Sequence, residues 1–160
     1  MTLSNIASIA TIVEALFVMI SVYFIWRELH ENVKLTRALN NQALVEISAP
    51  FNMQLIQDRS MAELWVFGTK KYADMDDVDR YRYHSLLIWW LILHENIYYQ
   101  YVGGLLDRGT YMAWDADLDG FVRTKKLWLY WESMKSNFRA DFASHVSEIA
   151  EKHRLAGTSQ

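Results

Sequence analysis

The segment from Asp115 to Gly120 carries three aspartates at alternating positions, which is how a calcium-binding EF-hand loop begins. Asp115, Asp117 and Asp119 would supply carboxylate oxygens, and Gly120 stands where such a loop turns sharply. The twelfth position, however, is Lys126, where a bidentate glutamate should close the site. We therefore interpret the segment as a capped turn between two helices, with the three aspartates as metal candidates that lack a full ligand set.

A second group of residues suited to metal binding or acid–base chemistry consists of His84, His94 and Glu95. The spacing of the two histidines places them on different faces of a helix, so they cannot hold one ion as an i,i+4 pair would. Neither an HExxH motif nor a paired Glu-x-x-His motif occurs in the chain. The simpler interpretation makes His94 a hydrogen-bonded core histidine, and an enzyme with a pocket near His94 and Glu95 is the third functional hypothesis.

Glu14 is the only charged side chain between Leu3 and Trp26. This run exceeds the roughly 20 helical residues that cross a bilayer core. A cleaved signal peptide would begin with Lys or Arg, which this N-terminus lacks. The sequence therefore predicts a transmembrane anchor over residues 1–27, with its apolar helix starting near Ile6. A buried helix of a soluble protein and a signal peptide are the alternatives.

Aromatic and basic residues follow the apolar run, and Tyr23, Trp26 and Arg27 form a predicted membrane-interface anchor. Lys34 and Arg37 come next, whereas no basic residue precedes the run. Under the positive-inside rule, this asymmetry predicts that the C-terminal part of the chain is cytoplasmic.

Small and hydroxylated residues share one face of this helix with Glu14. Small residues let helices approach closely in lipid, whereas a carboxylate facing lipid costs about 2.5–3.5 kcal/mol. We therefore predict that this face packs against another helix, either of a second copy or of another membrane protein. A channel- or transporter-like oligomer with Glu14 facing a pore is the alternative. The predicted contact residues are Ala7, Ala10, Thr11, Glu14, Val18 and Ser21.

The helical pattern continues after the anchor, and Pro50 is the first residue expected to interrupt it. Because a proline disfavours the α conformation of the residue before it, a juxtamembrane helix over 28–49 should end or kink near Ala49. Residues 50–155 are expected to form a small helical bundle, followed by a flexible tail over 156–160. Its helices are predicted at about Met61–Tyr72, Asp77–Val102, Asp107–Asp117, Thr124–Ser136 and Phe138–Arg154.

The composition narrows the fold and function classes. One proline and six glycines disfavour a turn-rich β protein, so the predicted fold class is all-α. A net charge of −3 gives no basic surplus, and nucleic acid is not an expected partner. The absence of cysteine excludes a thiol nucleophile and a thiolate zinc site. The chain also lacks phosphate-binding and nucleophile-elbow motifs, so no cofactor is predicted.

Two stretches of the chain resemble parts of an uncharacterised family of small bacterial single-pass membrane proteins with a C-terminal helical domain. They are Ile20–Ala38, ISVYFIWRELHENVKLTRA, and His94–Asp107, HENIYYQYVGGLLD. The chain departs from the family at Trp26–Leu29, where Gln-Ile-Arg is more usual. The resemblance implies a membrane helix before a helical domain, in a bacterial inner membrane. It implies no activity, and no catalytic residue carries over.

These patterns together predict a non-enzymatic, membrane-anchored interaction or assembly protein. Its expected partners are the lipid bilayer and either a second copy of the chain or the subunits of a larger membrane complex. The first case makes the protein a homo-oligomer, and the second makes it an accessory subunit.

Overall fold

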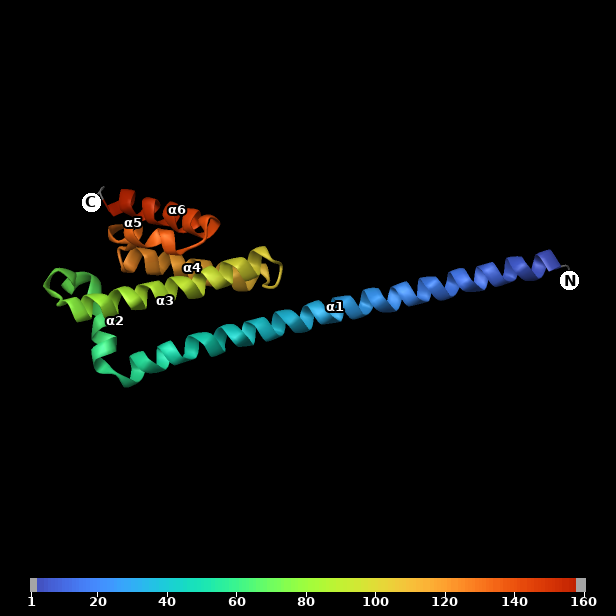
Figure 1. The fold of residues 1–160 in the computed structure, drawn as a ribbon, viewed down its shortest axis with the longest axis horizontal. Coiled ribbons are helices and arrows are strands. Elements are labelled where there is room, and N and C mark those ends of the chain that lie inside the picture. The colour runs from blue at the N-terminus through green and yellow to red at the C-terminus, as the bar shows by residue number, and fades with distance from the viewer. Residues whose placement is uncertain (1–2, 158–160) are drawn as a thin grey trace. The chain divides into compact units, whose positions relative to one another are not determined.

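The computed structural model describes residues 3–157, with side chains from Thr11 onward. Over this range the chain is helical and contains no strand, which confirms the predicted all-α class and its long first helix (Figure 1). The chain divides into two compact units at Leu39 and Asn40. The elements are α1 (Leu3–Gln57), α2 (Arg59–Lys71), the 3-10 turn η1 (Tyr72–Asp74), α3 (Asp77–Val102), α4 (Arg108–Thr124), η2 (Leu127–Leu129), α5 (Trp131–Met134), η3 (Lys135–Asn137) and α6 (Ala140–Gly157).

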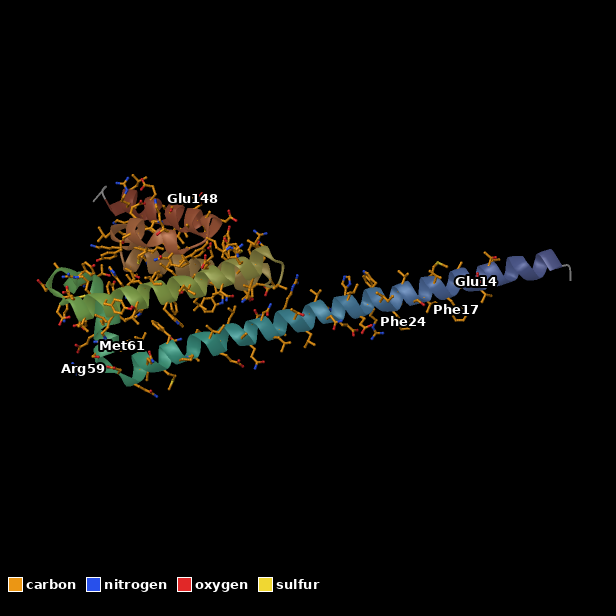
Figure 2. All side chains as sticks on the ribbon, viewed as in Figure 1. Glu14, Phe17, Phe24, Arg59, Met61 and Glu148 are labelled. Atoms are coloured by element: carbon orange, nitrogen blue, oxygen red, sulfur yellow. The ribbon has the colours of Figure 1, made fainter. Side chains whose placement is uncertain are left out.

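The first unit consists of the N-terminal part of α1, and every side chain described from Thr11 to Leu39 is exposed. Glu14, Phe17 and Phe24 project from the helix in Figure 2. Within the part of the chain that the structure describes, no helix is both long and apolar enough to cross a membrane. The predicted span is therefore not supported by the described residues. Ile6, Ala7 and Ala10, which the prediction includes, lie outside the residues with described side chains.

Of the two outcomes predicted near Ala49, an end or a kink, the structure excludes an end, because helix α1 runs through Pro50 to Gln57. A proline inside a helix removes one hydrogen bond and costs about 3 kcal/mol. Pro50 is exposed, so water can solvate the carbonyl that loses its partner. Leu44 and Phe51 are seven residues apart, about two helical turns, so they share one face of α1. They are 1% and 6% exposed. Their burial offsets the cost of the proline and keeps the chain helical.

Aspartates begin the next two long helices. The Asp58 carboxylate accepts hydrogen bonds from the backbone N–H groups of Ser60, at 2.8 Å, and Met61, at 3.2 Å. The Asp76 carboxylate accepts one from the backbone of Asp79, at 2.8 Å. Each satisfies N–H groups that lack a partner in the first turn of a helix.

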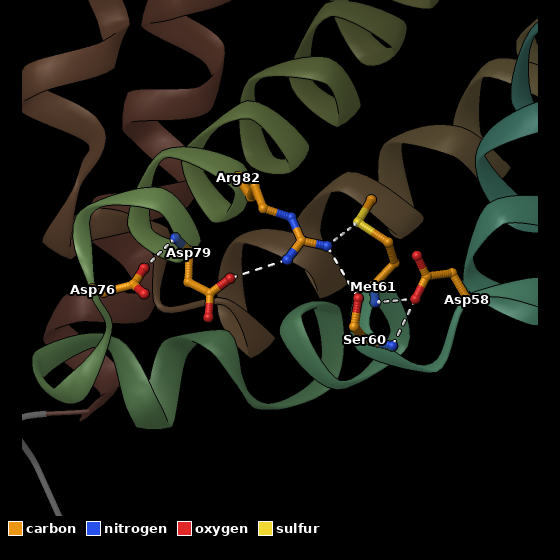
Figure 3. A network of polar contacts seen from close by, with 6 residues as sticks. All are labelled: Asp58, Ser60, Met61, Asp76, Asp79 and Arg82. Atoms are coloured by element: carbon orange, nitrogen blue, oxygen red, sulfur yellow. Dashed lines mark hydrogen bonds and ion pairs between the residues drawn. The ribbon is translucent and has the colours of Figure 1, made fainter.

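Arg82 connects these two helix starts (Figure 3). Its guanidinium donates to Asp79 Oδ1 at 3.0 Å on its own helix. It also donates to Ser60 Oγ at 3.1 Å and lies 3.2 Å from Met61 Sδ in α2. The contacts hold the first turn of α2 against α3, and all four residues belong to the second unit.

Helix α3 has the predicted bounds and is central to the second unit. Tyr83, Leu87 and Leu91 are fully buried along it, and Gly103 follows its last residue. Helix α4 contacts both α3 and α6 and lies between them in Figure 1. The larger buried cluster draws on α1, α2, α3, α4, η2, α5 and α6, so these elements share one core.

The C-terminal half differs from the prediction in its boundaries. Helix α4 continues to Thr124 instead of ending at Asp117, because Leu118, Phe121 and Val122 extend its buried face. It ends where Lys126 adopts a left-handed conformation, with φ of 49°. The segment expected as one helix over Thr124–Ser136 is instead η2, α5 and η3, in succession.

Candidate functional site

Asp115, Asp117 and Asp119 lie inside α4, so the interpretation of this segment as a capped turn between two helices is wrong. A helix rotates about 100° per residue, and alternating positions on it point in different directions. Asp117 therefore faces α3, whereas Asp115 and Asp119 face α6. Within the described residues, no group of three or more His, Asp or Glu side chains could hold a metal ion.

His94 is buried in α3, at 2% exposed, and its Nδ1 lies 2.9 Å from the backbone oxygen of Trp90. Its other ring nitrogen, Nε2, lies 3.3 Å from Asp117 Oδ2. The adjacent Glu95 points elsewhere, since its carboxylate accepts a hydrogen bond from the backbone of Arg139 at 2.7 Å. The hollow beside His94 has a volume of about 10 Å³, at the lower limit for one water molecule. The structure thus does not bring His94 and Glu95 to one pocket.

Two imidazole–carboxylate pairs join α4 to α6. His145 Nε2 lies 2.6 Å from Asp115 Oδ1. His153 Nε2 lies 2.9 Å from Asp119 Oδ2, and Lys152 Nζ lies 2.9 Å from Asp119 Oδ1. The aspartates singled out in the sequence therefore connect helices in the second unit.

These contacts predict how one substitution depends on pH. The hydrogen bond from Lys152, with a further one from His153, lowers the pKa of Asp119 below its ordinary 3.8. A carboxylate whose pKa is lowered by folding stabilises the fold above its unfolded pKa, and loses that contribution as the pH falls through the folded value. Asp119→Asn should therefore destabilise the protein at pH 7 by about 1 kcal/mol or less, because a third of the side chain is exposed and screened by solvent.

Thermal unfolding at pH 7, and in acid below the lowered pKa, checks this expectation. The difference between Asp119→Asn and wild type should disappear in acid. Glu148 is an exposed carboxylate on α6, so Glu148→Gln is the matched control. It should leave the unfolding temperature unchanged at both pH values. A difference that persists in acid would mean that the charge of Asp119 is not its cause.

Phe51 lines two hollows in the second unit. One is an apolar groove of about 550 Å³, which includes Pro50, Leu86 and Trp89. The other is a hollow of about 400 Å³ with a mixed lining. That lining is Phe51, Asn52, Leu55, Trp65, Trp90, Ala116, Asp117, Gly120, Phe121, Thr124 and Lys125.

Lys125 is the chemically distinctive residue of the second hollow. Its side chain is buried, and the residue is only 8% exposed. Its ammonium donates a hydrogen bond to the backbone oxygen of Trp65 and lies 4.0 Å from the centre of that indole ring. Burial lowers the pKa of Lys125 to about 8. The amine is therefore still mainly protonated at pH 7.

Adjacent lysines such as Lys125 and Lys126 are ordinarily both solvated, but here Lys125 is buried and Lys126 is exposed. The burial of Lys125 could have been predicted from its spacing along the helix. Lys125 follows Leu118, Phe121 and Val122 at helical intervals, so it continues the apolar stripe of α4. A lysine in such a stripe indicates a buried amine.

The residues of the predicted membrane segment are all exposed where the structure describes them. Ser21 donates a hydrogen bond to the backbone oxygen of Phe17 at 2.8 Å. Of the predicted interface anchor, Arg27 forms an ion pair with Glu31 at 3.0 Å. The rings of the other two anchor residues, Tyr23 and Trp26, have centres 6.3 Å apart; Thr11, Glu14 and Val18 are exposed.

The fold defines the protein as an all-helical chain whose first helix extends into a helical core. No protein-family model, curated protein or solved structure matches the chain. The family resemblance drawn from Ile20–Ala38 and His94–Asp107 therefore stays a prediction, and function rests on the chain's own residues.

Proposed function

We propose that the protein is a membrane-anchored, non-enzymatic interaction protein whose N-terminal helix inserts in a lipid bilayer. The observation that carries this proposal is the exposure of consecutive apolar side chains on α1. Their exposed fractions lie between 44% and 67%, and soluble monomers rarely expose a contiguous apolar patch of this kind. They are Ile12, Val13, Leu16, Phe17, Val18, Met19, Ile20, Val22, Tyr23, Phe24, Ile25 and Trp26.

The distribution of these side chains favours lipid over a soluble coiled coil. A coiled coil buries a stripe along each helix and leaves the opposite face polar. From Leu16 to Ile20 the chain is apolar at every position, so apolar groups occupy the whole circumference. A helix that is hydrophobic all round is buried in a large core or in a membrane. The apolar run also reaches back to Leu3 with Glu14 as its only charge.

The proposed partner surface within the membrane is the face that carries Glu14. Among the described residues, no side chain forms an ion pair or hydrogen bond with Glu14. A carboxylate in lipid is stabilised by protein or water around it. Contact with another helix, from a second copy or from another membrane subunit, would supply that environment. Under the positive-inside rule, Arg27, Lys34 and Arg37 after the apolar run would put the helical core at the cytoplasmic face of a bacterial inner membrane.

Membrane insertion is tested by adding charge at matched positions of the same helix. The double variant Leu16→Arg/Ile20→Arg should leave the membrane fraction, since each arginine costs about 2.5–3.5 kcal/mol at the centre of a span. The control Leu35→Arg/Leu39→Arg alters equally apolar, exposed residues beyond the proposed span and should remain membrane-bound. The measurement is the fraction of protein that resists alkaline extraction of membranes. Wild type in the soluble fraction, or equal behaviour of the two variants, would contradict insertion.

The nature of the partner is tested by sizing the detergent-purified protein expressed alone. A monodisperse multimer that Glu14→Leu dissociates would support self-association through this face. A monomer would rule out the homo-oligomer and leave the accessory-subunit form of the proposal, which requires a second protein to co-purify from native membranes. If neither a multimer nor a stoichiometric partner is found, the interaction role is wrong.

A further inference from the structure

The hollow around Lys125 has the dimensions and walls of a small-molecule site. Its volume of about 400 Å³ lies within the range of roughly 300–1,000 Å³ typical of ligand pockets. Four aromatic rings line it and contact one another. Trp65 is central, with ring centres 5.1 Å from Phe51, 5.9 Å from Trp90 and 5.8 Å from Phe121. These rings offer flat apolar surfaces from α1, α2, α3 and α4.

Lys125 brings a positive charge to this hollow without a counter-ion. None of the ion pairs formed by the described residues includes Lys125, and burial is the only influence on its pKa. One carbonyl, that of Trp65, and the face of one indole ring are its polar contacts. An ammonium has three N–H donors, so donors remain for a ligand. Buried charges are ordinarily paired, and an anion here would supply the missing partner.

The one carboxylate in the lining does not neutralise Lys125. Asp117 Oδ2 lies 3.3 Å from His94 Nε2, so this oxygen points toward α3. Gly120 leaves open space in the wall of the hollow, because a Cβ placed at this position meets no atom within 4 Å. The hollow therefore combines open space, aromatic surface and an unpaired cation.

We propose that this hollow binds a small apolar monocarboxylate, whose carboxylate pairs with Lys125 and whose ring or chain packs on the aromatic walls. The size of the hollow, its aromatic lining and its unpaired amine each restrict the class of ligand that can bind. A large polyanion does not fit the volume, a neutral compound leaves the charge unpaired, and a cation is repelled. The site is independent of the membrane proposal, since every lining residue belongs to the second unit.

Three probes of matched shape test this assignment by titration calorimetry on the full chain in detergent. Phenylacetate should bind saturably, at least tenfold more tightly than phenylacetamide, and phenethylamine should bind most weakly. The affinity for phenylacetate should fall about tenfold between pH 7 and pH 9, because the protonated fraction of an amine with a pKa of about 8 falls by that factor. The affinity for the amide should not change.

Three variants separate the charge from the space. Lys125→Met keeps the length of the side chain and should abolish the preference for the acid over the amide; replacing a buried charge by an apolar group is often neutral for stability. Gly120→Leu should fill the opening and weaken both ligands at least tenfold. Asp117→Asn is the control and should bind phenylacetate no more weakly than wild type.

Equal affinities for acid and amide, retention of the preference in folded Lys125→Met, or no saturable binding of phenylacetate would overturn the proposal. Tighter binding of phenethylamine would also overturn it, since the aromatic walls and Asp117 would then recognise a cation. Circular dichroism confirms that each variant folds before its affinity is compared.

Discussion

Replacing Gly68 with alanine is expected to destabilise the protein by about 2 kcal/mol, within the roughly 1–3 kcal/mol typical of overpacking a core. A Cβ at this position would lie 2.3 Å from Cε2 and 2.4 Å from Cδ2 of the Tyr83 ring. Tyr83 is fully buried, and its hydroxyl lies 2.5 Å from Thr69 Oγ, so the ring cannot move aside freely. Alanine normally gains about 0.8–1.0 kcal/mol over glycine inside a helix, and the steric clash outweighs that gain here.

Gly120→Ala is the matched control, because Gly120 is also inside a helix but has open space around it. It should stabilise the protein by roughly 0.5–1 kcal/mol. The double variant Gly68→Ala/Tyr83→Leu should lose less stability than the sum of its single variants, since the smaller side chain relieves the clash. Thermal unfolding of the full chain in detergent compares wild type with Gly68→Ala, Tyr83→Leu, the double variant and Gly120→Ala. Stabilisation by Gly68→Ala would show that the contact with Tyr83 does not limit this position.

Phe142→Ala is expected to cause the larger loss, about 3–5 kcal/mol, as for other buried phenylalanines. Phe142 is fully buried on α6. Its ring centre lies 5.8 Å from that of Tyr98 in α3 and 5.9 Å from that of Phe138. Truncation removes an aromatic contact between α6 and α3 and leaves a cavity at that point.

Phe67→Ala provides the comparison for Phe142→Ala, because Phe67 is 42% exposed on α2. Its loss should cost about 1 kcal/mol or less, since little apolar area is returned to water. The measured quantity is the shift in unfolding midpoint, converted to free energy at a common temperature. Similar shifts for the two variants would mean that α6 does not share the core of the second unit.

Local patterns in the sequence were enough to predict several elements. Helix α3 has the predicted bounds because Asp76 can cap its start and Gly103 follows its end, both of which act over one turn. The all-α class followed from the scarcity of proline and glycine and from helical periodicity. The long first helix was also predictable, although its end was not.

Other features depended on contacts between residues distant in sequence. Pro50 is a strong local signal to end a helix, yet α1 continues because Phe51 packs against Trp65 and Trp89. The cost of one lost hydrogen bond is local, whereas the compensating burial comes from α2 and α3. No spacing rule within α1 contains that information.

The aspartates of α4 show the same division between local pattern and tertiary contact. In the sequence, the alternating positions of Asp115, Asp117 and Asp119 suggested a capped turn with candidate oxygen ligands for one ion. In the fold they contact His145, His94 and His153, which lie in other helices.

Glu14 and Lys125 illustrate the difference between what the sequence predicts and what only the tertiary structure shows. The apolar run around Glu14 lies in one stretch of the chain, so the sequence alone predicts a membrane anchor. The hollow around Lys125 is assembled from four helices, and only their packing removes the amine from water and leaves it without a counter-ion. Hydrophobic runs and helix caps act between near neighbours and can be recognised in one dimension. Burial of a charge depends on which distant side chains surround it, and that was decided by the tertiary structure.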